Sequence, residues 1–158
     1  MDDKIIWCLK QKRGVKIVEP NENLYKAYIL KAREALEAMN VNFERKILSW
    51  AVSASYYARY FAVYALLSKI GIKSEIHDCT IELFKFLFVD MNKVNIKFYE
   101  ELKSAKDCRI EAQYYFPDFK SLKLQSTREF VLEIEKLAEQ LREKDILELR
   151  KKLKSKLI

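Results

Sequence analysis

Apolar residues follow helical spacing along most of the chain. They recur three and four positions apart over residues 22–39, 76–89, 95–115 and 119–155, as one buried face of a helix requires. Residues 43–70 are instead apolar over most of the helix circumference, which predicts a central helix covered on all sides. The pattern therefore predicts an all-α fold, an antiparallel up-and-down bundle of four to five helices.

A few residues indicate where these helices begin and end. Asn21 can cap the first helix, Asn40 to Asn42 are expected to end it, and Gly71 is suited to the C-terminal cap of the central helix. The fourth helix is expected to end near Phe116-Pro117. Residues 1–20 are predicted to form an N-terminal strap with one helical turn around 2–10, and residues 21–158 a single helical domain.

Composition excludes several classes of protein. The chain has 158 residues but only two glycines and two prolines, so it lacks the glycine-rich loops of dinucleotide-binding folds, P-loop enzymes and α/β-hydrolases. The net charge of +7 favours contact with nucleic acid or another acidic partner. Basic residues interrupt the N-terminal apolar cluster and no apolar run approaches the roughly 20 residues of a membrane span, so we expect a cytoplasmic protein without membrane contact.

Three cysteines lie far apart in the sequence, at positions 8, 79 and 108. Their odd number and wide spacing predict free thiols in a reducing compartment. His77 and Cys79 are the only close His/Cys pair, and no second pair completes a zinc site, so we predict neither a metal nor a cofactor.

Three groups of residues could carry chemistry. His77 is the single histidine; it could act as an acid or base, or bond to the backbone of the loop before its helix. Arg109, followed by Tyr114 and Tyr115, could hold a phosphate while the rings stack on a base. Alternatively, Arg109 pairs with Asp107 or Glu111 and the tyrosines close the end of the bundle.

The third group lies on the central helix. Ser55, Tyr56 and Tyr57 belong to a run whose aromatic rings cover both faces of the helix, so some should point away from the core. Exposed tyrosines on a central helix indicate a partner surface, most simply a homodimer interface.

In their order, these features resemble HEPN domains (higher eukaryotes and prokaryotes nucleotide-binding) over about residues 20–150. The residues that carry the resemblance are Tyr28, Lys31-Ala32, Ala35-Leu36, Ala51 to Tyr60, Ala65 to Leu67 before Gly71, Ser74 to His77, and Arg109 with Ala112 to Tyr114.

The resemblance implies a dimeric helical bundle that is often encoded beside a minimal nucleotidyltransferase. Many such proteins are metal-independent ribonucleases or toxins with an Arg-x4-6-His motif at the dimer interface. Arg109 corresponds to that arginine, whereas Tyr114 and Tyr115 stand where the histidine is expected. In some toxin–antitoxin pairs the partner modifies a tyrosine beside this motif, and Tyr114 or Tyr115 could be that acceptor.

The residues and the resemblance together predict a nucleotide- or RNA-binding helical protein, and the resemblance implies that it acts with a nucleotidyltransferase partner, as in a toxin–antitoxin system. Arg109 would contact phosphate. One alternative is a metal-independent ribonuclease in which His77 supplies the imidazole. The other is a structural bundle that acts only through protein contacts.

Overall fold

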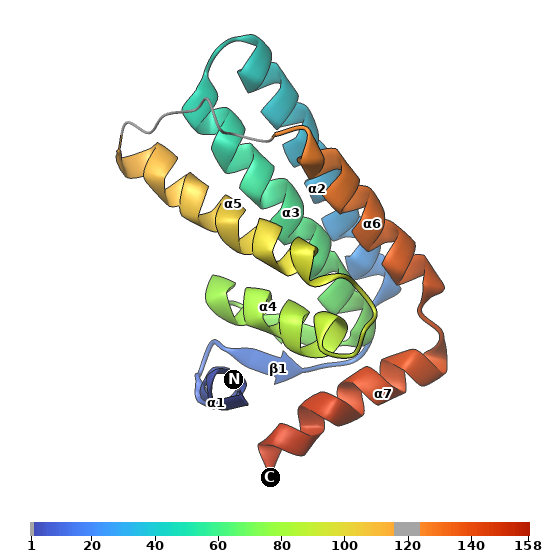
Figure 1. Cartoon of the computed structure of the whole chain (residues 1–158). Coiled ribbons are helices and arrows are strands. Elements are labelled where there is room, and N and C mark those ends of the chain that lie inside the picture. Colours follow the sequence, from blue (N-terminus) through green and yellow to red (C-terminus); the bar gives the residue numbers. More distant parts are fainter. Residues whose placement is uncertain (1, 116–123) are drawn as a thin grey trace.

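In the computed structural model of the chain, which describes residues 2–115 and 124–158, four long helices run antiparallel and smaller elements close one end (Figure 1). The elements in chain order are α1 Asp2–Lys10, β1 Val15–Ile17, α2 Glu22–Glu44, α3 Leu48–Ile70, β2 Ile72–Ser74, α4 His77–Phe84, the π-helical turn η1 Lys85–Val89, α5 Ile96–Tyr114, α6 Ser126–Gln140, α7 Glu143–Lys154 and the 3-10 turn η3 Ser155–Leu157. The predicted all-α bundle is confirmed, with a two-stranded sheet added to it.

Helix α3 is the centre of the core. It packs against α2, α5 and α6, and its buried side chains point in all directions, as its apolar circumference predicts. Small residues one turn apart let the neighbouring helices approach closely. These small residues, all buried, are Ala51, Ser55, Ala58, Ala62 and Ala65.

Both predicted caps are confirmed. The side chain of Asn21 accepts a hydrogen bond from the backbone N–H of Leu24 at 2.9 Å, at the start of α2. Gly71 ends α3 in the left-handed region, with φ of 79°. The guanidinium of Arg150 also reaches this turn, where Nη1 donates to the carbonyls of Val18, Ile70 and Gly71 at 2.7, 2.9 and 2.9 Å. A Cβ at position 71 would lie 2.4 Å from the backbone oxygen of Val18 and 2.7 Å from the backbone nitrogen of Pro20, so both the backbone angle and the space require glycine.

Several predicted boundaries are wrong. Helix α2 continues through Asn40 to Asn42 and ends at Glu44. The Asn42 side chain donates to the Ala38 carbonyl within the helix at 2.7 Å, so it bonds inside the helix rather than ending it. The chain turns instead around Lys46, which has φ of 62°. Helix α3 accordingly begins at Leu48 rather than at residue 43.

The last two predicted helices also differ from the structure. The helix predicted at 119–155 is divided into α6 and α7 by the extended residue Leu141. Asp145 then accepts from the backbone N–H of Arg142 at 2.9 Å and caps α7. The helix predicted at 76–89 changes from α to π geometry at Lys85. The predicted helix end near Phe116-Pro117 and the start at 119 lie outside the described residues.

The N-terminal segment has more regular structure than the predicted strap. Residues 2–10 form a whole helix, and β1 pairs antiparallel with β2, Lys16 opposite Lys73. A three-residue strand is too short to show the alternation by which strands are recognised in a sequence.

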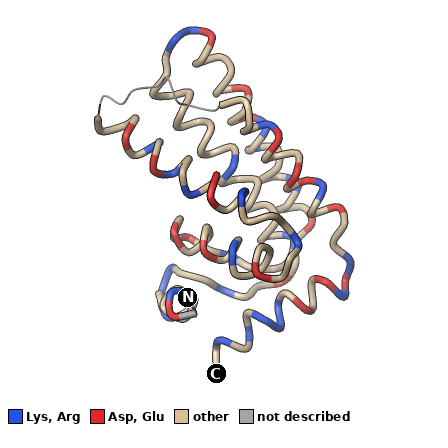
Figure 2. The backbone as a smooth tube through the Cα atoms, in the orientation of Figure 1, with Lys and Arg blue, Asp and Glu red and all other residues tan. Residues whose placement is uncertain are grey.

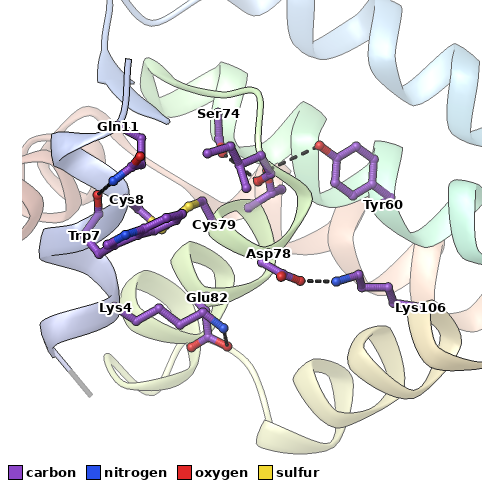
Figure 3. Close-up of a disulfide and its surroundings, with 12 residues drawn as sticks. Lys4, Trp7, Cys8, Gln11, Tyr60, Ser74, Asp78, Cys79, Glu82 and Lys106 are labelled. Atoms are coloured by element: carbon purple, nitrogen blue, oxygen red, sulfur yellow. Dashed lines mark hydrogen bonds and ion pairs between the residues drawn. A yellow bond between two sulfur atoms is a disulfide. The ribbon is translucent and has the colours of Figure 1, made fainter. Parts of the chain in front are cut away.

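The prediction of three free thiols is also wrong. Cys8 of α1 and Cys79 of α4 form a disulfide, shown in Figure 3, and both residues are fully buried. Cys108 is the one free cysteine of the described chain. The two partners are 71 residues apart, so their pairing depends on how α1 packs on α4 and leaves no local signal in the sequence.

Charges of both signs are spread over the molecule (Figure 2), although the two charged residues of α3, Arg59 and Lys69, are basic and those of α4, Asp78 and Glu82, are acidic. None of the helices in the described part of the chain is long and apolar enough to cross a bilayer.

We expect the disulfide to contribute substantially to stability. Substitution Cys8→Ser or Cys79→Ser should lower the free energy of unfolding by about 4 kcal/mol, since the bond closes a long loop in the unfolded chain. Urea denaturation with and without reductant measures this difference, and Cys108→Ser is the matched control. An unchanged denaturation midpoint after reduction of the wild-type protein would contradict the expectation.

Candidate functional site

The candidate site is built on one face of α3. Tyr56 and Tyr60 lie one helical turn apart, so their rings point to the same side, toward the first residue of α4. That residue is His77, whose ring lies flat against the ring of Tyr60 with centroids 4.1 Å apart and planes 10° apart. Both tyrosines are buried within the chain, so the imidazole has a rigid support.

His77 is held by a hydrogen bond as well as by stacking. Its Nδ1 lies 2.8 Å from the hydroxyl of Tyr56. Burial raises the pKa of Tyr56 well above its ordinary range, so this hydroxyl stays protonated and can donate to Nδ1. The same hydroxyl can also accept a hydrogen bond from Nδ1–H, and in that tautomer Nε2 carries no proton. Burial also lowers the pKa of His77, and the nearby charges of Arg109 and Lys106 lower it further, so the imidazole is neutral near pH 7.

Arg109 approaches the same tyrosines from α5. Its guanidinium carbon lies 5.1 Å from the ring centre of Tyr56 and 5.6 Å from that of Tyr57. One terminal nitrogen, Nη1, donates to the Tyr57 hydroxyl at 3.3 Å and to the side-chain oxygen of Gln113 at 3.4 Å. The Nε–H is buried and has no partner among the described residues.

No carboxylate in the described ranges lies within ion-pair distance of Arg109. The predicted alternative, in which it pairs with Asp107 or Glu111, is therefore not observed. Its partners are neutral oxygen atoms and aromatic rings, which leave its positive charge uncompensated by direct contact.

A second cation stands beside His77. Lys106, one turn before Arg109 on α5, forms an ion pair with Asp78 of α4 (Figure 3). The hydrogen bond from Lys106 lowers the pKa of Asp78 below its ordinary range. Asp78 thus balances the charge of Lys106, and the remaining positive charge of the site comes from Arg109.

The arrangement combines an uncompensated guanidinium, a neutral imidazole and tyrosine hydroxyls. Such groups can bind a phosphate and can exchange a proton next to it. Among the described residues there is no group of three His, Cys, Asp or Glu side chains that could hold a metal ion. Cys79 is in a disulfide, so it offers no thiolate beside His77.

The structure brings Arg109 and His77 together, although the sequence places them in different helices. Both contact Tyr56, which lies between them on α3. Tyr114 is the last residue of α5 and Tyr115 follows it, and their exposed fractions are 75% and 69%. These two rings are thus open to solvent beyond the end of the site.

The three residues predicted at a dimer interface lie in different surroundings. Ser55 and Tyr56 are buried within the chain itself, and Tyr57 is half-buried. Ser55 bonds to Arg59, a buried arginine that forms an ion pair with Glu101 at 2.9 Å. Of the three, Tyr57 is the one that a second copy of the chain could reach.

Sequence reasoning missed four residues of this site, namely Tyr60, Asp78, Lys106 and Gln113. Lys106, Arg109 and Gln113 share one face of α5 by their spacing of three and four, and this spacing was the available signal. Nothing in the sequence indicates that this face meets the start of α4.

Comparison with known proteins identifies the family. The model of the HEPN domain matches residues 25–149, which include most of α2, all of α3 to α6 and all the residues of the site. Because the match covers most of the chain, the chain belongs to the HEPN domain family.

Two curated relatives match about half of the chain. "Putative toxin MJ0142" of Methanocaldococcus jannaschii is 29% identical over 86 residues, 54% of this chain and 58% of that protein. "UPF0332 protein glr0978" of Gloeobacter violaceus is 27% identical over 84 residues, 53% of this chain and 67% of that protein. The alignment thus spans less than two thirds of the archaeal relative.

The electrostatics of the site can be tested through its one histidine. NMR titration should give His77 a pKa below its ordinary value of 6.5, and Arg109→Gln should raise it because a nearby positive charge is removed. Below pH 6.5 the unfolded chain then binds more protons than the folded one, so stability should fall as the pH drops through the folded pKa.

Arg33→Gln is the matched control for that titration, because Arg33 pairs with Glu135 on α6 rather than contacting the tyrosines of the site. It should leave the pKa of His77 unchanged. A wild-type value at or above 6.5 would contradict the placement of His77 beside the guanidinium.

Proposed function

We propose that this HEPN protein binds the phosphate of a nucleotide or of RNA at Arg109 and acts with a nucleotidyltransferase partner in a toxin–antitoxin system. The observation that carries the proposal is the set of contacts that Arg109 makes and lacks. Its guanidinium is packed on two tyrosine rings, contacts no carboxylate of the described chain and keeps a buried N–H without a partner. A phosphate bound at the guanidinium would supply the missing negative charge.

The wider charge distribution supports this proposal. The chain carries a net charge of +7, which attracts a polyanion over long range, and Arg109 gives that attraction a defined point of contact. The archaeal relative bears the name of a toxin, which agrees with a toxin–antitoxin context for this chain.

A second function, metal-independent cleavage of RNA, is favoured by the position of His77. Its Nε2 belongs to a neutral imidazole that lies on Tyr60, and Tyr56 connects it to Arg109. In such a reaction Nδ1–H would donate to Tyr56 and Nε2 would accept the proton of a 2′-hydroxyl. The 2′-oxygen would bond to phosphorus while the bond to the 5′-oxygen breaks and that oxygen takes a proton from water, and the guanidinium would stabilise the charge that develops on the phosphate. The motif of the family has a histidine at the place that Tyr114 and Tyr115 occupy in this chain. His77 would take over the role of that histidine.

The exposed tyrosines give the partner a target. Tyr114 and Tyr115 are exposed at the end of α5, where an enzyme could transfer a nucleotidyl group from ATP to the hydroxyl oxygen of one of them, with release of pyrophosphate and the hydroxyl proton. Incubation with the partner nucleotidyltransferase and ATP should add a nucleotidyl mass to this tyrosine pair. Mass spectrometry that finds no adduct would remove this part of the proposal.

Binding and cleavage of end-labelled single-stranded RNA in EDTA test the main proposal. The wild-type protein should bind, and Arg109→Ala should weaken binding and reduce the slope of log affinity against log salt by about one unit, the loss of one phosphate contact. Arg33→Ala removes the same charge from an exposed arginine on α2 and is the matched control.

The outcomes separate the candidate functions. Cleavage that is lost in both Arg109→Ala and His77→Ala would establish the ribonuclease. Binding without cleavage, weakened by Arg109→Ala and not by Arg33→Ala, would support the binding protein. Absence of both would leave a bundle that acts through protein contacts and would overturn the proposal.

A further inference from the structure

A second feature of the molecule, a pocket of about 650 Å³, lies between α2, α3 and the C-terminal end of α5. Its volume is within the range of sites that hold small molecules. Its walls include Asn42, Trp50, Ser53, Tyr57, Phe61 and Gln113. None of the chemistry described above explains this pocket.

The pocket adjoins the guanidinium of Arg109 through two shared residues. Tyr57 and Gln113 line the pocket, and the same two side chains accept hydrogen bonds from Nη1 of Arg109. A ligand whose phosphate contacted Arg109 would therefore have this pocket on one side of it.

The walls of the pocket combine flat aromatic surfaces with neutral polar groups. The indole of Trp50 is 64% exposed, while Tyr57 and Phe61 are half-buried and lie against each other with ring centroids 5.8 Å apart. Polar lining groups come from Asn42, Gln113 and Ser53. Ser53 is 3% exposed, and its hydroxyl has no hydrogen-bond partner in the described chain.

The charges on the lining argue against a second phosphate in the pocket. Lys31 and Glu34 both line it, so a cation is accompanied by a carboxylate. Lys31 also lies over the ring of Phe61, 5.4 Å from its centre. A flat neutral ring with hydrogen-bonding edges fits these walls better than an anion does.

We propose that this pocket is the subsite for the nucleobase of the nucleotide or RNA whose phosphate Arg109 holds, an inference that depends on the proposed function of Arg109. The base stacks on Trp50 and Tyr57, and its polar edge meets the side chains of Asn42, Ser53 and Gln113. Base–aromatic stacking is sequence-tolerant, because every base has a flat π-face. The polar edge then provides the means to prefer one base.

Fluorescence of Trp50 tests the subsite directly. The chain has two tryptophans, so the variant Trp7→Phe leaves Trp50 as the only indole. Nucleoside 5′-monophosphates should quench this signal and bind about tenfold more tightly than ribose 5-phosphate, which has the phosphate and no base. In Trp50→Ala, measured by calorimetry, the affinity for the nucleotide should fall about tenfold and that for ribose 5-phosphate should not change.

Two further variants separate stacking from a loss of structure. Trp50→Phe should recover most of the nucleotide affinity, because an aromatic face is restored at an exposed position. Trp7→Ala, which removes the other partly exposed indole on α1, should leave both affinities unchanged.

The ligands also separate this inference from the proposed function. Nucleotides that bind no more tightly than ribose 5-phosphate, with affinity lost in Arg109→Ala, would overturn the base subsite and leave the phosphate site standing. Quenching by free nucleosides without any binding of ribose 5-phosphate would support the subsite and overturn the role of Arg109. Absence of all binding would overturn both.

Discussion

The burial of α3 on every side is the constraint on which the rest of the structure depends. A helix that is apolar around its whole circumference is stable in water only when other elements cover it, and α2, α5 and α6 do so. The covering helices then bring their own side chains to its surface. The candidate site exists because α5 and the start of α4 meet one face of this helix at Tyr56.

Two arginines, Arg59 of α3 itself and Arg109 of α5, lie in opposite electrical surroundings. Arg59 is buried beside Glu101, and this ion pair compensates its charge within the fold. Arg109 faces aromatic rings and neutral oxygen atoms instead. The positive charge of Arg59 is balanced by a carboxylate inside the bundle, whereas that of Arg109 has no such carboxylate beside it and can attract an external anion.

What the sequence reveals depends on how local the governing interaction is. The central helix, the Asn21 cap and the Gly71 cap are set by neighbouring residues, and all three were predictable. The disulfide and the pairing of β1 with β2 join segments far apart in the chain, and no local sequence pattern predicts them. The site combines both cases, since Arg109 and His77 were each recognisable by residue type while their meeting at Tyr56 required the fold.

The bond between Cys8 and Cys79 turns the first half of the chain into a covalent ring that contains α2 and α3. A protease that cuts the backbone once inside this ring produces two polypeptides that remain attached to each other. The helix that carries Tyr56 and the residue His77 therefore stay in one molecule after such a cut. A single nick in the turn around Lys46, at the tip between α2 and α3, would become visible only after reduction.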